Sequence, residues 1–372
     1  MSGPVVITGG GTGGHVFPMQ AVAEALRAQG LATSELRYVG SRRGQEGRLL
    51  GNGDVALTLL PGRGLRRSWR PKDALVNLGA ALGLAAAVVS AIALLRRWRP
   101  AVVVSVGGYA SFAVSFAAMC WRTPLVLVEL DATPGAAQRI VGRYAVKRCC
   151  AFPVEGANVV LTGAPLRAGI EAVDRSKAAR DAAKAAQTPP IDPARLVVVV
   201  MTGSLGSARV NRAVRELATK WDSRDDRAIV HVTGRRDFDE VRARLPSSNG
   251  LDYRVIAFGD MVELWTLCDV AICRAGAVTI AELTALSIPS VLVPLPGAPG
   301  DHQTRNAEAV VKVGGAQLLA DANCTGDALA TVLEQLMVPA TLATMSRGAG
   351  TLARHDAARA IASVIADVRG TA

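Results

Sequence analysis

The sequence predicts an α/β protein in which two doubly wound parallel-sheet domains face a cleft. Short aliphatic runs recur along the chain, and most are followed by a glycine-bearing turn and an Ala/Leu-rich stretch with helical spacing, such as Ala21–Gln29. The 372 residues exceed the size of one ordinary domain. Only 4% of residues are aromatic, so the core must be built from Ala, Val and Leu, which suits parallel strands covered by helices on both faces.

The strand–turn–helix units fall into two groups. We expect strands at residues 5–7, 37–39, 102–104, 125–128 and 159–161, and then at 196–201, 228–232, 270–273 and 290–293. The charged stretch 173–193, with its proline-rich end, predicts a loop or linker between the halves, and the hinge is expected just before it, near 165–167. The domains are therefore expected at 1–165 and 166–350, with a closing helix at about 352–370 that packs back on the first domain.

Composition excludes several classes of protein. Half of the residues are apolar and 20% are charged, which excludes a disordered chain. The six cysteines form no Cys-x-x-Cys pair and are too sparse for a disulfide framework, so we expect reduced, buried thiols in a cytosolic protein. The first residues lack a basic region and lead directly into a strand, which argues against a secretion signal.

Positive charge is concentrated in the first half. Residues 1–165 hold 18 of the 42 Lys and Arg but only 8 of the 31 Asp and Glu, so they carry +10 of the net +11. Such a field favours an anionic partner, which nucleic acid, an anionic membrane face and a phosphorylated substrate all satisfy.

The segment Ala74–Leu95 has 22 residues without a charge, which is long enough to span a membrane. Eight of them are Ala, which weakens insertion, and arginines flank both ends. The segment also leads into the strand 102–104, whose sheet it must cover. We expect a helix partly buried on its own sheet, with basic, Trp-bearing ends on a membrane surface; an ordinary buried Ala-rich helix is the alternative.

Three glycine turns follow predicted strands, at residues 9–14, 105–108 and 202–207. Such turns offer backbone N–H groups at a helix start, which bind phosphate. Gly9-x-Gly11-x-x-Gly14 also fits a dinucleotide fingerprint, a weak signal when it stands alone. His15, at the mouth of the first turn, is either a helix cap or a general base.

A fourth turn follows the strand 270–273 and leads into a helix that begins at 277–279. Backbone donors and the Thr279 hydroxyl can hold a diphosphate there, while Glu282, one turn inside the helix, takes the two hydroxyls of a ribose. Considered alone, Glu282 would be a solvated residue near a helix dipole. Glycine turns in both halves indicate one phosphorylated ligand for each domain.

Six motifs, in matching order and spacing, make the chain resemble the MurG family, the UDP-GlcNAc:lipid I N-acetylglucosaminyltransferases of bacterial peptidoglycan synthesis. They cover residues 10–18, 107–109, 162–167, 203–206, 273–279 and 301–303. The resemblance spans nearly the whole chain and implies the GT-B architecture. In it, two Rossmann-like domains bind the acceptor (first domain) and the donor nucleotide (second domain).

The resemblance also implies a role for individual residues. The donor would contact the following: Gly276, Ala277, Val278 and Thr279 (phosphates and sugar), Glu282 (ribose), Ser204 (diphosphate), Arg167 (nucleotide), Phe258 (uracil) and Gln303 (GlcNAc hydroxyls). The acceptor diphosphate would contact Gly11, Thr12, Gly13, Gly14, Gly107, Gly108 and Tyr109. The implied reaction is an inverting attack of the 4-OH of lipid-linked MurNAc on the anomeric carbon, which releases UDP and gives lipid II.

The chain departs from the family at residues 128–131, where Val-Glu-Leu-Asp stands in place of the usual His-Glu-Gln-Asn. Leu205 and Thr304 also occupy positions where the family often has glutamine. Leu130 and Leu205 remove amides that could face the cleft, and Asp131 introduces a carboxylate. Both His15 and Asp131 therefore remain candidates for the catalytic base.

Asp237-Phe238-Asp239 spells the DxD motif of metal-dependent sugar transferases. The motif stands at an expected helix start, where acids are favoured by the helix dipole in any case. We therefore expect no metal or other cofactor to be required, because helix dipoles and hydroxyl donors would stabilise the leaving diphosphate.

The expected partners are UDP-GlcNAc, lipid I, an anionic membrane surface and other cell-wall synthesis or division proteins, but not nucleic acid. The expected location is peripheral, on the cytoplasmic face of the bacterial cell membrane. Three alternatives stay open: a soluble GT-B transferase for another nucleotide sugar or acceptor, a weakly active MurG-like scaffold protein, and a dehydrogenase.

Overall fold

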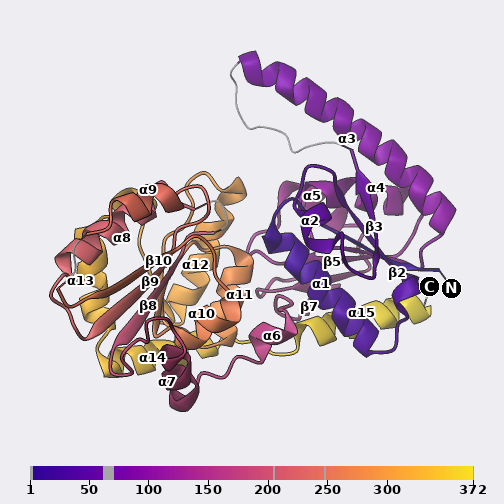
Figure 1. The fold of residues 1–372 in the computed structure, drawn as a ribbon. Coiled ribbons are helices and arrows are strands. Elements are labelled where there is room, and N and C mark those ends of the chain that lie inside the picture. Colours follow the sequence, from indigo (N-terminus) through magenta and orange to yellow (C-terminus); the bar gives the residue numbers. More distant parts are fainter. Residues whose placement is uncertain (1–2, 62–70, 204–205, 247–248, 372) are drawn as a thin grey trace. The chain divides into compact units, whose positions relative to one another are not determined.

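The computed structural model describes residues 3–61, 71–203, 206–246 and 249–371, and the chain forms two compact units (Figure 1). Unit 1 comprises Met1–Arg167 and Asp356–Ala372, and unit 2 comprises Ala168–His355. Each unit holds one parallel sheet, so the α/β class with two parallel-sheet domains is confirmed.

The sheet of unit 1 has seven strands in the order β3-β2-β1-β4-β5-β6-β7. The strands are β1 (Val5–Thr8), β2 (Leu36–Ser41), β3 (Ala56–Leu60), β4 (Val102–Ser105), β5 (Leu125–Glu129), β6 (Lys147–Cys150) and β7 (Val159–Leu161). Every residue of β1, β4 and β5 is buried, as expected for central strands covered on both faces. The helices are α1 (Gly13–Ala28), α2 (Glu46–Leu50), α3 (Pro71–Trp98), α4 (Tyr109–Cys120), α5 (Ala136–Gly142) and α15 (Ala357–Thr371).

Helix α15 completes unit 1 from the far end of the chain. It packs on α1, and its apolar residues Ile361, Ala362 and Ile365 are fully buried. Gln29 Nε2 donates hydrogen bonds to Arg359 O (3.3 Å) and Ser363 Oγ (3.1 Å), and Arg369 forms an ion pair with Glu35.

Helix α3 lies along α4 and packs on unit 1 through a stripe of buried residues: Ala80, Ala87, Ala91 and Leu95. The face away from this stripe carries Leu82 (66% exposed) and Val89 (67% exposed). Among the described residues, 79–98 form the one straight helix that is long and apolar enough to cross a membrane, and 22% of its most apolar window is buried within the protein.

The sheet of unit 2 has six strands in the order β10-β9-β8-β11-β12-β13. The strands are β8 (Leu196–Met201), β9 (Arg227–Val232), β10 (Asp252–Ile256), β11 (Val270–Cys273), β12 (Ser290–Leu292) and β13 (Ala316–Leu318). The helices are α6 (Ala168–Glu171), α7 (Lys177–Ala185), α8 (Ala208–Lys220), α9 (Phe238–Ala243), α10 (Met261–Leu267), α11 (Ala277–Ala285), α12 (His302–Lys312), α13 (Gly326–Leu336) and α14 (Pro339–Gly350).

The interpretation of residues 173–193 as a linker is wrong. They contain α7, which packs on α10 inside unit 2. The buried Lys184 Nζ donates to the carbonyl oxygens of Pro193 (3.1 Å) and Arg195 (2.7 Å), so the charge of this stretch serves the fold of unit 2. The expectation of buried thiols holds for five cysteines and fails for Cys120, which is exposed at the end of α4; all six are free.

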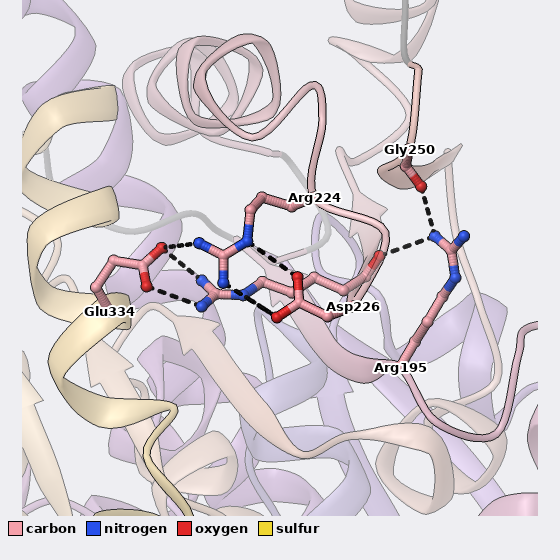
Figure 2. Close-up of polar contacts among 6 residues, drawn as sticks. Arg195, Arg224, Asp226, Gly250 and Glu334 are labelled. Atoms are coloured by element: carbon pink, nitrogen blue, oxygen red, sulfur yellow. Dashed lines mark hydrogen bonds and ion pairs between the residues drawn. The ribbon is translucent and has the colours of Figure 1, made fainter.

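A cluster of paired charges closes the amino edge of the unit 2 sheet, where β9 begins (Figure 2). Glu334 on α13 accepts hydrogen bonds from Arg224 and Arg227, each at 2.8 Å. Asp226 accepts two more from Arg224, which lower the pKa of its carboxyl group to about 2. The two arginines and the two carboxylates balance one another in charge. The bonds to Glu334 attach α13 to the sheet.

Candidate functional site

In unit 1 the predicted acceptor residues lie at the topological switch point of the sheet. Strand order runs outward from β1 to β2 and β3 on one side, and from β4 onward on the other. Ligands of such sheets bind beside the carboxyl ends of the strands at this point. The glycine turns after β1 and β4 both lie there, and Val106 N donates to Thr8 O (2.8 Å) between them.

His15 lies in the first turn of α1 and packs against the second glycine turn. A Cβ atom added to Gly108 would lie 2.9 Å from His15 Cδ2 and 2.1 Å from Gly10 O, and one added to Gly107 would lie 3.5 Å from His15 Nε2. The φ angle of Gly108 is +86°, so both conformation and space require glycine here. The structure thus brings together His15 and both predicted acceptor turns; Tyr109 begins α4 directly after them.

Gln138 on α5 is a residue of this region that sequence reasoning missed. Its Nε2 atom would be 3.2 Å from a Cβ on Gly107, and it donates to Val128 O (3.1 Å) at the end of β5. Gln138 lies in the first turn of α5, after the N-cap residue Gly135, and its place beside the turn after β4 is evident only from the structure.

Of the residues that depart from the family, Leu130 and Asp131 follow β5. At position 130, where an amide of the family could face the cleft, the Leu130 side chain is 4% exposed and belongs to the core. Asp131 is half-buried directly after it. The neighbouring Glu129 is held by two hydrogen bonds from Arg148 (3.1 and 2.8 Å), which fixes the end of β5 to β6.

Unit 2 has the same arrangement at its own switch point, between β8 and β11. One guanidinium, that of Arg274, ties together the loops at this edge. It donates to Val293 O (3.0 Å), Pro294 O (3.0 Å) and Ser207 Oγ (2.7 Å), and it forms a 2.8 Å ion pair with Asp321. Sequence reasoning missed this role of Arg274. An arginine directly after a buried strand could have indicated it.

Helix α11 begins directly after Gly276, and Ala277, Val278 and Thr279 form its first turn. Their N–H groups have no acceptor within the helix, so they provide an anion-binding end. Asn306 Nδ2 donates to Ala275 O (3.2 Å) and holds the turn against α12.

Glu282 lies one turn further along α11 and is 6% exposed. The indole N–H of the fully buried Trp265 donates to Glu282 Oε2 at 2.9 Å, which fixes the rotamer of the carboxylate. A solvated helix residue, the alternative considered from sequence, is therefore wrong for Glu282. Trp265, like Gln138 and Arg274, is a residue that the sequence did not single out.

The remaining predicted donor residues occupy separate places. Gln303 lies in the first turn of α12, and its Oε1 accepts a hydrogen bond from Leu295 N (2.9 Å), which leaves its NH₂ group to donate to a ligand. Phe258 is 65% exposed, with the Arg235 guanidinium 5.5 Å from its ring centre. Arg167, the last residue of the first segment of unit 1, stacks on Phe17 of α1 at 4.4 Å. Ser204 and Leu205 lie outside the described residues.

A buried polar network lies beneath the end of the turn after β8. Asn211 Nδ2 donates to Asp237 Oδ2 (3.0 Å), so its Oδ1 is the atom that accepts from His231 Nε2 (3.0 Å). The imidazole then accepts from the Tyr253 hydroxyl at Nδ1 (2.9 Å), and burial lowers the pKa of His231 to about 3. Asp237, from the DxD sequence, is thus bound by Asn211 and by the adjacent Arg236.

Family models match both units. Residues 5–149 match the glycosyltransferase family 28 N-terminal domain, and residues 197–362 match the glycosyltransferase family 28 C-terminal domain. The two matches together cover most of the chain.

Curated proteins and solved structures agree with these matches. The chain is 37% identical to the UDP-N-acetylglucosamine–N-acetylmuramyl-(pentapeptide) pyrophosphoryl-undecaprenol N-acetylglucosamine transferase of Alkalilimnicola ehrlichii over 98% of each chain. It is 35% identical to the enzyme of the same description from Myxococcus xanthus, over 98% of this chain and 92% of that one. Its structure is similar to Acinetobacter baumannii MurG, with a TM-score of 0.74 and 25% identity over 98% and 99% of the two chains. The glycosyltransferase of kitacinnamycin, at a TM-score of 0.73 and 17% identity, shares the fold.

Proposed function

This chain belongs to glycosyltransferase family 28 and is a MurG-type enzyme, and we propose that it transfers GlcNAc from UDP-GlcNAc to lipid I, giving lipid II. The supporting observation is similarity to transferases of this description along the full length of both chains, at 37% identity. Two parallel-sheet units, each with a glycine turn at its switch point, suit an enzyme that binds two diphosphate substrates.

In the proposed reaction the 4-OH of the MurNAc sugar attacks the anomeric carbon of GlcNAc with inversion. The bond between that carbon and the β-phosphate oxygen breaks, and its electron pair leaves with UDP. The hydroxyl proton passes to a base on unit 1, for which we propose His15, because its imidazole lies against both acceptor turns. The first-turn N–H groups of α11 and the Thr279 hydroxyl would stabilise the departing diphosphate, so that no metal is required.

The proposed function is tested by measuring UDP release with a soluble lipid I analogue and a panel of UDP- and dTDP-sugars. We expect turnover with UDP-GlcNAc, dependence on the lipid I analogue, and no loss of rate in EDTA. Preference for another sugar or acceptor would establish the alternative transferase. UDP-GlcNAc binding without turnover would instead support the scaffold protein.

We propose that unit 1 also docks on an anionic membrane through the outward faces of α3, α4 and α5. Large apolar side chains are exposed on and around these helices: Leu82, Val89, Phe116, Trp121, Ile140, Tyr144 and Val146. Arg96 stacks on Trp121 at 5.7 Å, so a cation lies beside an amphipathic ring. Such a combination of exposed apolar groups and arginines suits the interface of a bilayer, while the alanine stripe of α3 holds the helix on unit 1.

Neutralising the arginines before α3 and in its last turn is expected to release the protein from anionic liposomes. Each basic residue near the surface contributes about 1 kcal/mol, so a variant with Arg66, Arg67, Arg96 and Arg97 changed to Gln should lose most of its flotation with phosphatidylglycerol vesicles. A control with the same change in net charge neutralises exposed residues of unit 2: Arg212, Lys220, Arg347 and Arg354. Equal flotation of the two variants would contradict the proposed membrane face.

A further inference from the structure

Glu46 is a fully buried acid in unit 1. It lies at the carboxyl edge of the sheet, where the glycine turns also lie. It begins α2, and its side chain is 0% exposed. Its Oε1 atom accepts two backbone hydrogen bonds, from Ser41 N at the end of β2 (2.9 Å) and from Gly11 N in the turn after β1 (3.1 Å). One carboxyl oxygen therefore joins two loops at the carboxyl edge of the sheet.

Three glycines leave the space that this carboxyl group occupies. A Cβ atom on Gly10 would lie 1.8 Å from Glu46 Oε1, one on Gly40 would lie 2.7 Å from Glu46 Cγ, and one on Gly44 would lie 1.7 Å from Glu46 Oε2. The φ angle of Gly10 is +132°, which also requires glycine. At Gly10, therefore, the absent side chain makes room for Glu46, whereas no described atom lies within 4 Å of a Cβ on Gly11.

The hydrogen bond to Glu46 decides which N–H groups of the turn remain for a ligand. The Gly11 N–H points back into the protein, so it is not a donor to an acceptor diphosphate as the sequence suggested for this glycine. Helix α1 begins at Gly13 after Thr12, whose side chain makes no capping bond. His15 N donates to Thr12 O (3.1 Å), so the N–H groups of Gly13 and Gly14 at the start of α1 are the donors that remain.

The second carboxyl oxygen, Oε2, is buried and has no hydrogen-bond partner among the described residues. A buried polar atom without a partner is costly, and an apolar side chain would fill the same space at less cost. An apolar residue, however, could not accept the two backbone hydrogen bonds that Oε1 accepts from Ser41 N and Gly11 N.

We propose that Glu46 is a positioning residue of the acceptor-diphosphate site. It fixes the Gly10–Gly11 peptide so that the N–H groups at the start of α1 point at the ligand. This inference rests on the proposed function, because that function supplies the diphosphate acceptor.

Replacing Glu46 by Ala is expected to raise the KM for a lipid I analogue at least about tenfold, because small displacements of binding groups have large effects. The Kd for UDP, which binds to unit 2, should change less than about twofold. Glu46→Gln should restore the acceptor KM, because its amide oxygen can accept the same two N–H bonds. Acceptor binding is also measured directly, by titrating the analogue without donor.

Leu36→Ala provides the matched control for stability. Leu36 is fully buried at the amino end of β2, away from the glycine turns, so this variant destabilises the same unit without touching them. A rise in acceptor KM in Leu36→Ala equal to that in Glu46→Ala, or a failure of Glu46→Gln to restore it, would overturn the proposal. Failure of the wild-type protein to turn over would count against the proposed function, while the direct titration would still decide the role of Glu46.

Discussion

Replacing His15 by Ala is expected to lower kcat for GlcNAc transfer by about 10²- to 10⁴-fold, the usual contribution of a general base. The imidazole lies in the first turn of α1, against Gly107 and Gly108, so a bound acceptor diphosphate would bring its sugar hydroxyl close to this ring. The Kd for UDP should stay unchanged, because the predicted donor residues other than Arg167 lie in unit 2. Added imidazole should restore part of the rate of the Ala variant, since it can occupy the space that the side chain leaves.

Asp131→Asn is the variant that decides between the two candidate bases. Asp131 follows β5, two residues beyond the Glu129 that Arg148 holds in place. If His15 is the base, Asp131→Asn should keep kcat within about tenfold of wild type. A large loss in Asp131→Asn, together with a nearly normal rate in His15→Ala, would transfer the role to Asp131.

Replacing Glu282 by Ala is expected to weaken UDP binding by about 10- to 150-fold. Hydrogen bonds to a charged group contribute about 1.5–3 kcal/mol, which corresponds to this range of affinity. The carboxylate is buried and oriented by Trp265, so little of this interaction is screened by solvent. Isothermal titration with UDP measures the effect, and the acceptor KM should not change.

The ribose contact itself is tested by comparing UDP with 2′-deoxy-UDP. Wild-type protein should bind the deoxy ligand more weakly, whereas the Glu282→Ala variant should bind the two ligands equally, since the partner of the hydroxyl is gone. Trp265→Phe should give an intermediate preference, because it leaves Glu282 present but no longer oriented. Equal preference in wild type and Glu282→Ala would exclude a contact between Glu282 and this hydroxyl.

The sequence predicts those parts of the fold that have a simple local pattern of hydrophobic residues. Strands β1, β4 and β5 are wholly buried and β8 is buried in its four central residues; all four are mainly aliphatic runs, so they are evident from the sequence. Four strands were not predicted: β3, β6, β10 and β13. They are half-exposed or carry charges, as in Lys147-Arg148-Cys149-Cys150, because pairing with a neighbouring strand rather than local hydrophobicity makes them extended.

The same distinction applies to the candidate site. Glycine turns and helix starts are local patterns, so their positions at the two sheet edges could be predicted. Four side chains form hydrogen bonds with residues 10 to 67 positions away in the sequence: Glu46 with Gly11, Gln138 with Val128, Arg274 with Ser207, and Trp265 with Glu282. No local spacing indicates such partners. Leu130 illustrates the opposite case: a departure from the family that suggested altered recognition is a buried residue of the core.

The packing of α15 on α1 has a consequence for biosynthesis. Because α15 follows all of unit 2 in the chain, the ribosome completes unit 2 before it supplies the last helix of unit 1. During that interval the surface of α1 on which α15 will pack stays open to chaperones or to aggregation. Synthesis of this protein thus has a vulnerable period that ends only when its final helix arrives.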